Sequence, residues 1–203
     1  MPGEIFVITA PSGTGKTTLL KPLLAADQRL RFSISYTTRP RRPGEVEGQD
    51  YFFVSPAEFR HLRDSGELVE WVEQFGYEYG TSRKWVQETV QSGTDLVFDL
   101  DSRGARALKN DFPQSILIFI LPPSLEELEK RLTNRGSLSS EELARRLENG
   151  RAELQEAHWY DYMVINDDLA TAQSHLQAII TAARCRTARL WPRLAPRFVP
   201  HPP

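Results

Sequence analysis

APSGTGKTT, residues 10–18, separates an apolar run, IFVI at 5–8, from a segment whose leucines recur at helical spacing, LLKPLL at 19–24. This order of strand, glycine-rich turn and helix is the context in which such a loop binds phosphate. Its backbone N–H groups point at phosphate oxygens, and the helix adds its positive N-terminal end. We therefore expect the loop to bind ATP. The expected contacts are Ser12, Gly13, Thr14, Gly15, Lys16, Thr17 and Thr18.

Two side chains of this loop have individual expected roles. Lys16 would reach the β- and γ-phosphates, and the Thr17 hydroxyl would ligate Mg²⁺. The strict pattern has glycine six residues before the lysine, where this chain has Ala10, so the loop should enter with negative φ. A plain Gly/Ser/Thr turn between two core elements would not account for the lysine and threonine at these positions.

Length and composition suit one α/β domain with a sizeable core, since the chain has 203 residues, 40% hydrophobic and 26% charged. The net charge of −2 argues against bulk affinity for nucleic acid or an anionic membrane. A single cysteine, Cys185, permits no internal disulfide and suits a reducing compartment. No apolar stretch approaches membrane-spanning length. We therefore expect a cytoplasmic protein that binds neither nucleic acid nor membrane.

Four apolar runs show little polar alternation, which is typical of strands buried on both faces of a parallel sheet. Helical segments with serine-to-glutamate capping signals lie between them, as at Ser55. The sequence therefore predicts an α/β fold with a parallel β-sheet flanked by helices. The predicted strands are residues 5–10, 96–100, 116–121 and 163–165.

Three stretches depart from this alternation. Residues of about 35–81 are rich in arginine, tyrosine and glycine, with short alternating strands, and predict an inserted α+β subdomain. A Gly/Ser break and a charged helix at about 135–150 predict a helical lid. Prolines at 192, 196, 200, 202 and 203 argue against a continued helix, so we expect disorder over about 191–203. The core of this single domain is then about 1–34, 82–134 and 151–190.

A second motif, TTRPRRPGEVEGQDYFF at 37–53, gathers three arginines and a tyrosine in a turn-rich segment. Arginine forks match phosphate oxygens in pairs, and a tyrosine hydroxyl adds a further donor. Exposed arginines are common, so a solvated charge run is the alternative for this segment taken alone.

Together with the phosphate loop, Glu70, the segment YEYGT at 77–81 and the segment DLD at 99–101, this motif resembles guanylate kinase. The pattern T-[ST]-R-x-x-[KR]-x-x-[DE]-x-x-G-x-x-Y-x-F is met without a gap over 37–53, and the resemblance covers about 4–184. It implies a P-loop sheet with a GMP-binding subdomain and a lid. It also implies Mg²⁺-dependent transfer of the ATP γ-phosphoryl group to GMP or dGMP.

The resemblance implies roles for residues around the acceptor. Guanine presents two hydrogen-bond donors, N1–H and the N2 amine, to a carboxylate such as Glu70. Adenine has no such pair of donors. A site that hydrogen-bonds a substrate group can reject an analogue that lacks this group by about 10⁴–10⁵-fold. For Asp101 the alternative to a guanine contact is the cap of a helix starting near Ser102, and this alternative stays open. Arg39, Arg42, Tyr51 and Tyr79 would hold the GMP phosphate, and Ser35, Glu70, Thr81 and Asp101 would surround guanine.

Further implied residues serve the phosphoryl transfer. Asp99 ends an apolar strand, where a carboxylate helps to hold Mg²⁺, often through water. Arg103 replaces the glutamine usual in the family, which puts contacts near guanine or metal in doubt. The lid arginines would neutralise charge on the migrating group, the alternative being solvated surface arginines. The expected catalytic residues are Lys16, Arg42, Arg131, Arg135 and Arg146.

Two other functions compete with this interpretation. A related small-molecule kinase, such as a ribose 1,5-bisphosphate phosphokinase, would lack the guanine-binding set that includes Glu70. A non-catalytic phosphopeptide-binding module of the same fold would typically lose the phosphate loop, which is intact here. The expected partners are ATP and GMP or dGMP, and the sequence leaves open a homo-oligomer formed through the C-terminal helix.

Overall fold

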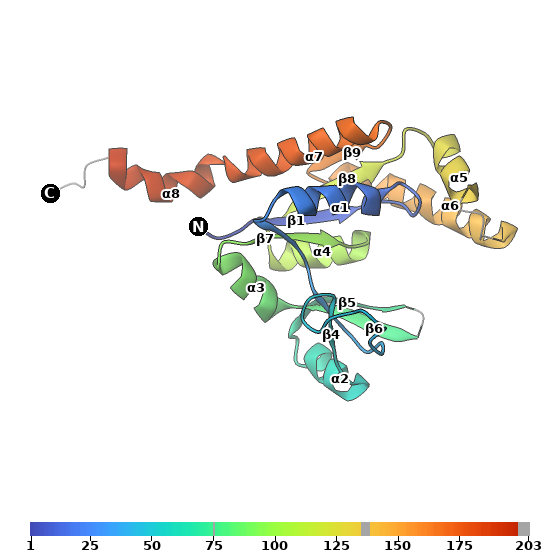
Figure 1. Cartoon of the computed structure of the whole chain (residues 1–203), viewed down its shortest axis with the longest axis horizontal. Coiled ribbons are helices and arrows are strands. Elements are labelled where there is room, and N and C mark those ends of the chain that lie inside the picture. The colour runs from blue at the N-terminus through green and yellow to red at the C-terminus, as the bar shows by residue number, and fades with distance from the viewer. Residues whose placement is uncertain (75, 135–138, 199–203) are drawn as a thin grey trace.

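The computed structural model describes residues 1–74, 76–134 and 139–198, which form two sheets with surrounding helices (Figure 1). The first sheet has five strands in the order β2-β7-β1-β8-β9, and every pair of neighbours is parallel. This confirms the expected α/β class. The strands are β1 (Ile5–Thr9), β2 (Leu30–Phe32), β7 (Asp95–Asp99), β8 (Ile116–Leu121) and β9 (Tyr162–Ile165).

Helices cover both faces of this sheet because the side chains of β1 alternate between two apolar clusters. Phe6 and Ile8 pack in one cluster with residues of α1 and α7, whereas Ile5 and Val7 pack in the other with residues of α3 and α4. Figure 1 shows the two helical layers above and below the sheet. The helices are α1 (Lys16–Ala26), α3 (Arg83–Gln91), α4 (Ser102–Asp111) and α7 (Leu169–Arg184).

The carboxyl ends of neighbouring parallel strands place the phosphate loop beside Asp99. The loop follows β1, and Asp99 is the last residue of β7, in register with Ile8 of β1. In open α/β sheets, ligands bind in the crevice at this end of the strands. The topology therefore fixes one side of the site.

The second sheet has four strands in the order β4-β3-β6-β5, of which β3 and β4 are parallel and the other pairs antiparallel. Helix α2 packs on it through the fully buried Phe59, and Ser55 and Glu58 form a capping box at the start of this helix. The elements are β3 (Ser35–Thr37), β4 (Tyr51–Phe53), α2 (Pro56–Asp64), β5 (Leu68–Gln74) and β6 (Tyr77–Ser82).

Helices α5 (Leu125–Thr133) and α6 (Ser140–Gln155) pack beside the phosphate loop, and the short 3₁₀ helix η1 (Glu156–Trp159) leads from α6 towards β9. Helix α6 begins in a capping box between Ser139 and Glu142. Arg135, one of the expected catalytic residues, lies outside the described residues.

The C-terminal segment corrects one expectation. Residues Thr187–Phe198 form helix α8, although the prolines predicted that the chain would leave helical structure after Trp191. Pro192 and Pro196 are four residues apart and exposed, so they share one solvent face where water can satisfy the carbonyls that lose a partner. Within the described ranges, every helix is too short or too polar to span a bilayer.

Candidate active site

The phosphate loop depends on two glycines with left-handed backbone. Gly13 has φ 91° and Gly15 has φ 95°, a region that side chains disfavour. A Cβ at Gly13 would lie 2.7 Å from Leu132 Cδ2 of α5, and one at Gly15 would lie 2.6 Å from Asn166 Nδ2. Both glycines are therefore required by their neighbours as well as by their backbone conformation.

Lys16 begins helix α1, and its ammonium forms an ion pair with Asp99 at the end of β7. Phosphoryl transfer needs such a cation on phosphate oxygens, and so the pair marks the position that phosphates would take. Thr17 and Thr18 follow on the exposed side of the same helical turn.

The oxygen ligands near Lys16 fit a magnesium ion that arrives with a nucleotide. Mg²⁺ in kinases takes one or two protein oxygens and fills its other positions with waters and phosphates. Asp99 and Thr17 can supply two such oxygens. Nowhere in the described residues do three His, Cys, Asp or Glu side chains gather to hold a metal ion by themselves. The donor set therefore fits Mg²⁺ bound together with phosphate.

A cavity of about 980 Å³ lies between the two sheets and joins the loop to β5. Lys16, Asp99 and Asp101 line it on the side of the parallel sheet, and Glu70 lines it on the opposite side. The cavity is therefore bounded at one end by the expected phosphoryl donor site and at the other by the expected guanine-binding residue.

Glu70 is held by the neighbouring strand. Thr81 Oγ1 donates a hydrogen bond of 2.7 Å to Glu70 Oε1, and the two residues are paired in register between β5 and β6. An irregularity between Leu68 and Glu70 shifts the register there, as bulges do beside binding sites. Burial raises the pKa of Glu70, the Thr81 hydrogen bond lowers it, and the charge of Asp101 raises it further. A desolvated acceptor of this kind favours a ligand that supplies hydrogen-bond donors.

Asp101 performs the helix-capping role that the sequence left open. Its Oδ1 accepts a hydrogen bond of 2.8 Å from Gly104 N at the start of α4. Its Oδ2 lies 3.7 Å from Nη2 of the largely exposed Arg103, and both side chains line the cavity. One carboxylate oxygen thus builds the helix end, while the other faces the cavity beside Arg103.

Arg39 is the centre of a second polar cluster. Its side chain is 8% exposed, and its guanidinium lies 5.3 Å from the centre of the Tyr51 ring. The rings of Tyr51 and Tyr79 meet edge to face at 5.9 Å. Glu45 Oε1 accepts a hydrogen bond of 2.6 Å from Arg39 Nη2, and its Oε2 accepts one of 2.7 Å from Arg42 N. This cluster holds a carboxylate where the resemblance expects a phosphate.

The remaining acceptor residues are less constrained. The side chain of Arg42 is exposed, while its backbone is fixed by Glu45. Ser35 is half-buried at the start of β3, in register with Tyr51 of β4. Ser35 lies on the sheet that carries Glu70 and Tyr79, and Arg42 lies in the loop between β3 and β4 of that sheet.

The lid arginines reach the phosphate loop from α5 and α6. Arg131 Nη1 donates to Asn166 O at 3.0 Å and to Thr14 O at 3.4 Å, and its Nε donates to Glu127 at 2.9 Å. Arg146 Nη1 lies 3.2 Å from Ser12 Oγ. The loop is therefore bordered by two cations whose side chains can turn to a bound phosphate.

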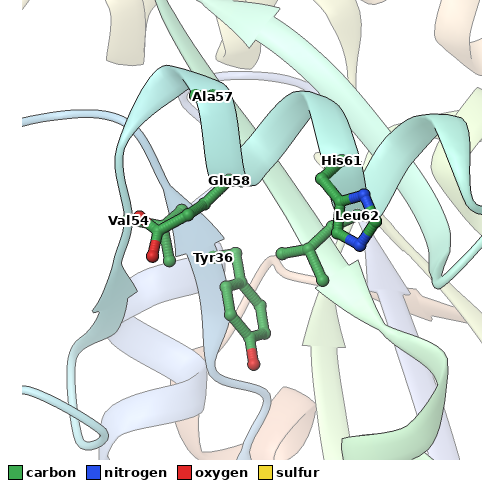
Figure 2. A pocket seen from close by; sticks show the side chains of 6 residues that line it. All are labelled: Tyr36, Val54, Ala57, Glu58, His61 and Leu62. Atoms are coloured by element: carbon green, nitrogen blue, oxygen red, sulfur yellow. The ribbon is translucent and has the colours of Figure 1, made fainter.

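A second cavity, of about 490 Å³, lies between β3 and α2 (Figure 2). Its lining is mainly apolar, with Tyr36 between Val54 and Leu62. Successive strand residues point to opposite faces, so Tyr36 faces away from the side of Ser35. This cavity is separate from the one that Glu70 lines.

Three residues of the site were not assigned a role from the sequence, or only a weak one. Glu45 occupies the acidic position of the motif at 37–53, which was the available signal. Asn166 Nδ2 donates a hydrogen bond of 2.6 Å to Thr14 O. Glu153 lines the large cavity from α6, and its only sequence signal is its spacing of seven from Arg146.

A parallel sheet whose first strand leads into a lysine-containing phosphate loop, with arginines converging on that loop, defines the class of P-loop kinases. Residues 3–183 match the family model described as guanylate kinase. The chain is 45% identical over 196 residues to the guanylate kinase of Geobacter metallireducens, covering 97% of both chains. It is 46% identical to that of Geobacter sulfurreducens over 93% of both.

A solved structure agrees with these relatives. The crystal structure of guanylate kinase from Anaplasma phagocytophilum matches with a TM-score of 0.70 and 32% identity, covering 97% of this chain and 96% of that one. The chain belongs to the guanylate kinase family, and its function is that of a guanylate kinase.

Proposed function

We propose that the chain transfers the γ-phosphoryl group of MgATP to the phosphate of GMP, giving ADP and GDP. One observation carries this most directly: the same cavity is lined by Lys16 at the phosphate loop and by the desolvated Glu70 on the opposite sheet. Lys16, a cation suited to phosphate, and Glu70, a hydrogen-bond acceptor suited to guanine, therefore line the same cavity.

On the donor side, the backbone N–H groups of residues 12–18 would bind the ATP phosphates, and Lys16 would contact the β- and γ-phosphates. Thr17 and Asp99 would hold Mg²⁺, Asp99 through water. The ion would neutralise charge on the phosphates when bound. Lys16 would leave Asp99 for the phosphates in this arrangement, because Asp99 would then serve Mg²⁺.

On the acceptor side, Glu70 would accept hydrogen bonds from guanine N1–H and N2, with Ser35, Thr81 and Asp101 beside it. Arg39, Arg42, Tyr51 and Tyr79 would bind the GMP phosphate in line with the donor. Phosphoryl transfer needs positioning and charge neutralisation more than a general base. None of these contacts requires the ribose 2′-hydroxyl, so dGMP should also react.

The lid completes the site. Arg131, Arg135 and Arg146 would turn to the migrating phosphoryl group when residues of about 135–150 close over ATP, and closure would exclude water. The insertion of about 35–81 would move with GMP. We expect the enzyme to work in the cytoplasm, since Cys185 is its only cysteine.

A coupled ADP-release assay tests this function. The full chain would be supplied with MgATP and, separately, with GMP, dGMP, AMP, UMP and CMP. Release confined to GMP and dGMP, and lost in Lys16→Ala, supports the proposal. Release with ribose phosphates in place of nucleotides would favour the sugar-phosphate kinase, and phosphopeptide binding without release would favour the scaffold module.

A further inference from the structure

The inner face of α6 lies along the phosphate loop. Arg146, Gly150 and Glu153 are spaced four and three residues apart and so share one helical face. Arg146 Nη1 lies 3.2 Å from Ser12 Oγ, and a Cβ at Gly150 would lie 3.6 Å from Pro11 Cβ. The helix thus passes close to the loop, and its next turn brings Glu153 to the cavity.

Glu153 has a shielded carboxylate oxygen without a partner. Its Oε2 is hidden from solvent and makes no hydrogen bond within the described part of the chain. It lines the 980 Å³ cavity together with Lys16, Asp99 and Asp101. Burial raises the pKa of Glu153, the charge of Lys16 lowers it, and that of Asp101 raises it. A shielded, unpaired acceptor is unfavourable in the empty protein, which indicates that its partner comes with the working state.

The nearby cation is the candidate for that partner. Lys16 is paired with Asp99, the carboxylate that Mg²⁺ would also require. When the nucleotide arrives, the ammonium must therefore give up Asp99 and point its three donors elsewhere. Two would go to phosphate oxygens, and one remains for a carboxylate on the other side of the cavity.

We propose that Glu153 is a positioning residue, which accepts a hydrogen bond from the Lys16 ammonium once Asp99 is engaged by the metal of MgATP. This rests on the proposed function, in which Lys16 and Asp99 serve the donor nucleotide. The lid helix would then contribute to the donor site at two points, with Arg146 on the phosphates and Glu153 orienting the lysine. The packing of α6 on the phosphate loop and the orientation of the Lys16 side chain would then be coupled.

Glu153→Gln tests the proposal, because it keeps the shape and removes the charge. Glu148→Gln is the matched control, since Glu148 is exposed on the same helix. Calorimetric titration of the full chain would give the Kd for MgATP and for ATP in the presence of EDTA. We expect Glu153→Gln to weaken MgATP about tenfold and ATP without metal less than about twofold, because Lys16 can stay on Asp99 only when no metal needs it.

Thermal unfolding separates positioning from a structural role. Since Glu153 has an unpaired buried oxygen, Glu153→Gln should keep or raise the Tm, whereas loss of a structural contact would lower it. Turnover should fall about tenfold or more with the KM for GMP unchanged, and Glu153→Asp should recover part of it. If Glu153→Gln does not fold, Glu153→Asp should show the same split between MgATP and metal-free ATP.

Equal weakening of both ATP forms, or none of either, would overturn the proposal, as would a Tm that falls in parallel with turnover. The activity of the wild-type protein distinguishes a failure of the proposed function from a failure of the role proposed for Glu153. If it transfers no phosphoryl group to GMP, the proposed function fails. If it does so while Glu153→Gln matches Glu148→Gln, the role of Glu153 alone is rejected.

Discussion

Replacing Glu70 by Gln should remove most of the preference for guanine. Burial raises the pKa of this carboxyl group, and its Oε1 already accepts a hydrogen bond from Thr81. The amide keeps that acceptor for Thr81, so the fold should be retained. Its one oxygen can still accept from Thr81 and from one guanine donor, but its NH2 group opposes the other guanine donor. One hydrogen bond to a charged group is therefore lost, and the second becomes a bond to a neutral group.

The magnitude follows from those two bonds. A hydrogen bond to a charged group contributes about 1.5–3 kcal/mol and a neutral one about 0.5–1.5 kcal/mol, so losing the first bond and neutralising the second costs about 2.5–4.5 kcal/mol. At about 1.4 kcal/mol per factor of ten, kcat/KM for GMP should fall by about 10²–10³-fold. AMP presents fewer donors to this position, so its kcat/KM should change little, and the ratio of GMP to AMP should collapse.

The assay is coupled ADP release with GMP and with AMP, at fixed saturating MgATP. Glu73→Gln is the matched control, because Glu73 lies on the same strand and lines the same cavity but is exposed. A fall in kcat/KM for GMP of less than about fivefold would refute the assignment of Glu70 to guanine, and so would an equal fall for AMP.

Three further predictions follow from single contacts. Because burial raises the pKa of Glu70, GMP kcat/KM should fall on acidification at a higher pH than an ordinary glutamate would give, and its pH profile with Glu70→Gln should lack this limb. Gly15→Ala should weaken ATP binding about tenfold or more by fluorescence titration, whereas Gly44→Ala, with φ 90° but open space, should not. Arg184→Met should lower the free energy of unfolding by about 3–5 kcal/mol in urea, since it strips the largely buried Asp95 of a 2.7 Å partner; a change under about 1 kcal/mol would contradict this.

The phosphate loop and the parallel sheet could be predicted because their signals are local. Lysine and glycine spacing in residues 10–18 and the apolar runs identify the loop and most strands without knowledge of distant contacts. Strand β2 was not predicted, since it has three residues and only Leu30 is buried. Its place comes from pairing with β7, where Leu30 is opposite Asp95, a contact that no local pattern reports.

The residues of the site likewise fall into those that a local motif identifies and those that only the tertiary fold brings together. A motif with fixed spacing identifies Arg39 and Tyr51, because they lie twelve residues apart in one turn-rich segment. Glu153 belongs to no such motif, since it reaches the cavity that Lys16 lines only when α6 packs on the loop. For helix α8, a local signal was present but gave the wrong prediction. Proline does remove a backbone hydrogen bond from a helix, but Pro192 is exposed, so water can bind the carbonyl that loses its partner.

The pairing of Glu45 with Arg39 has a consequence for which anions the acceptor site can retain. An incoming anion finds this guanidinium already neutralised, so it exchanges one oxyanion for another and gains little from Arg39 alone. Net affinity must then come from groups beyond the charge, namely the tyrosine hydroxyls and the base at Glu70. Inorganic phosphate and sulfate bring no base for Glu70, so we expect them to be poor competitors at such a site. The Arg39–Glu45 pair should thus make binding at this site depend on the base as well as on the phosphate.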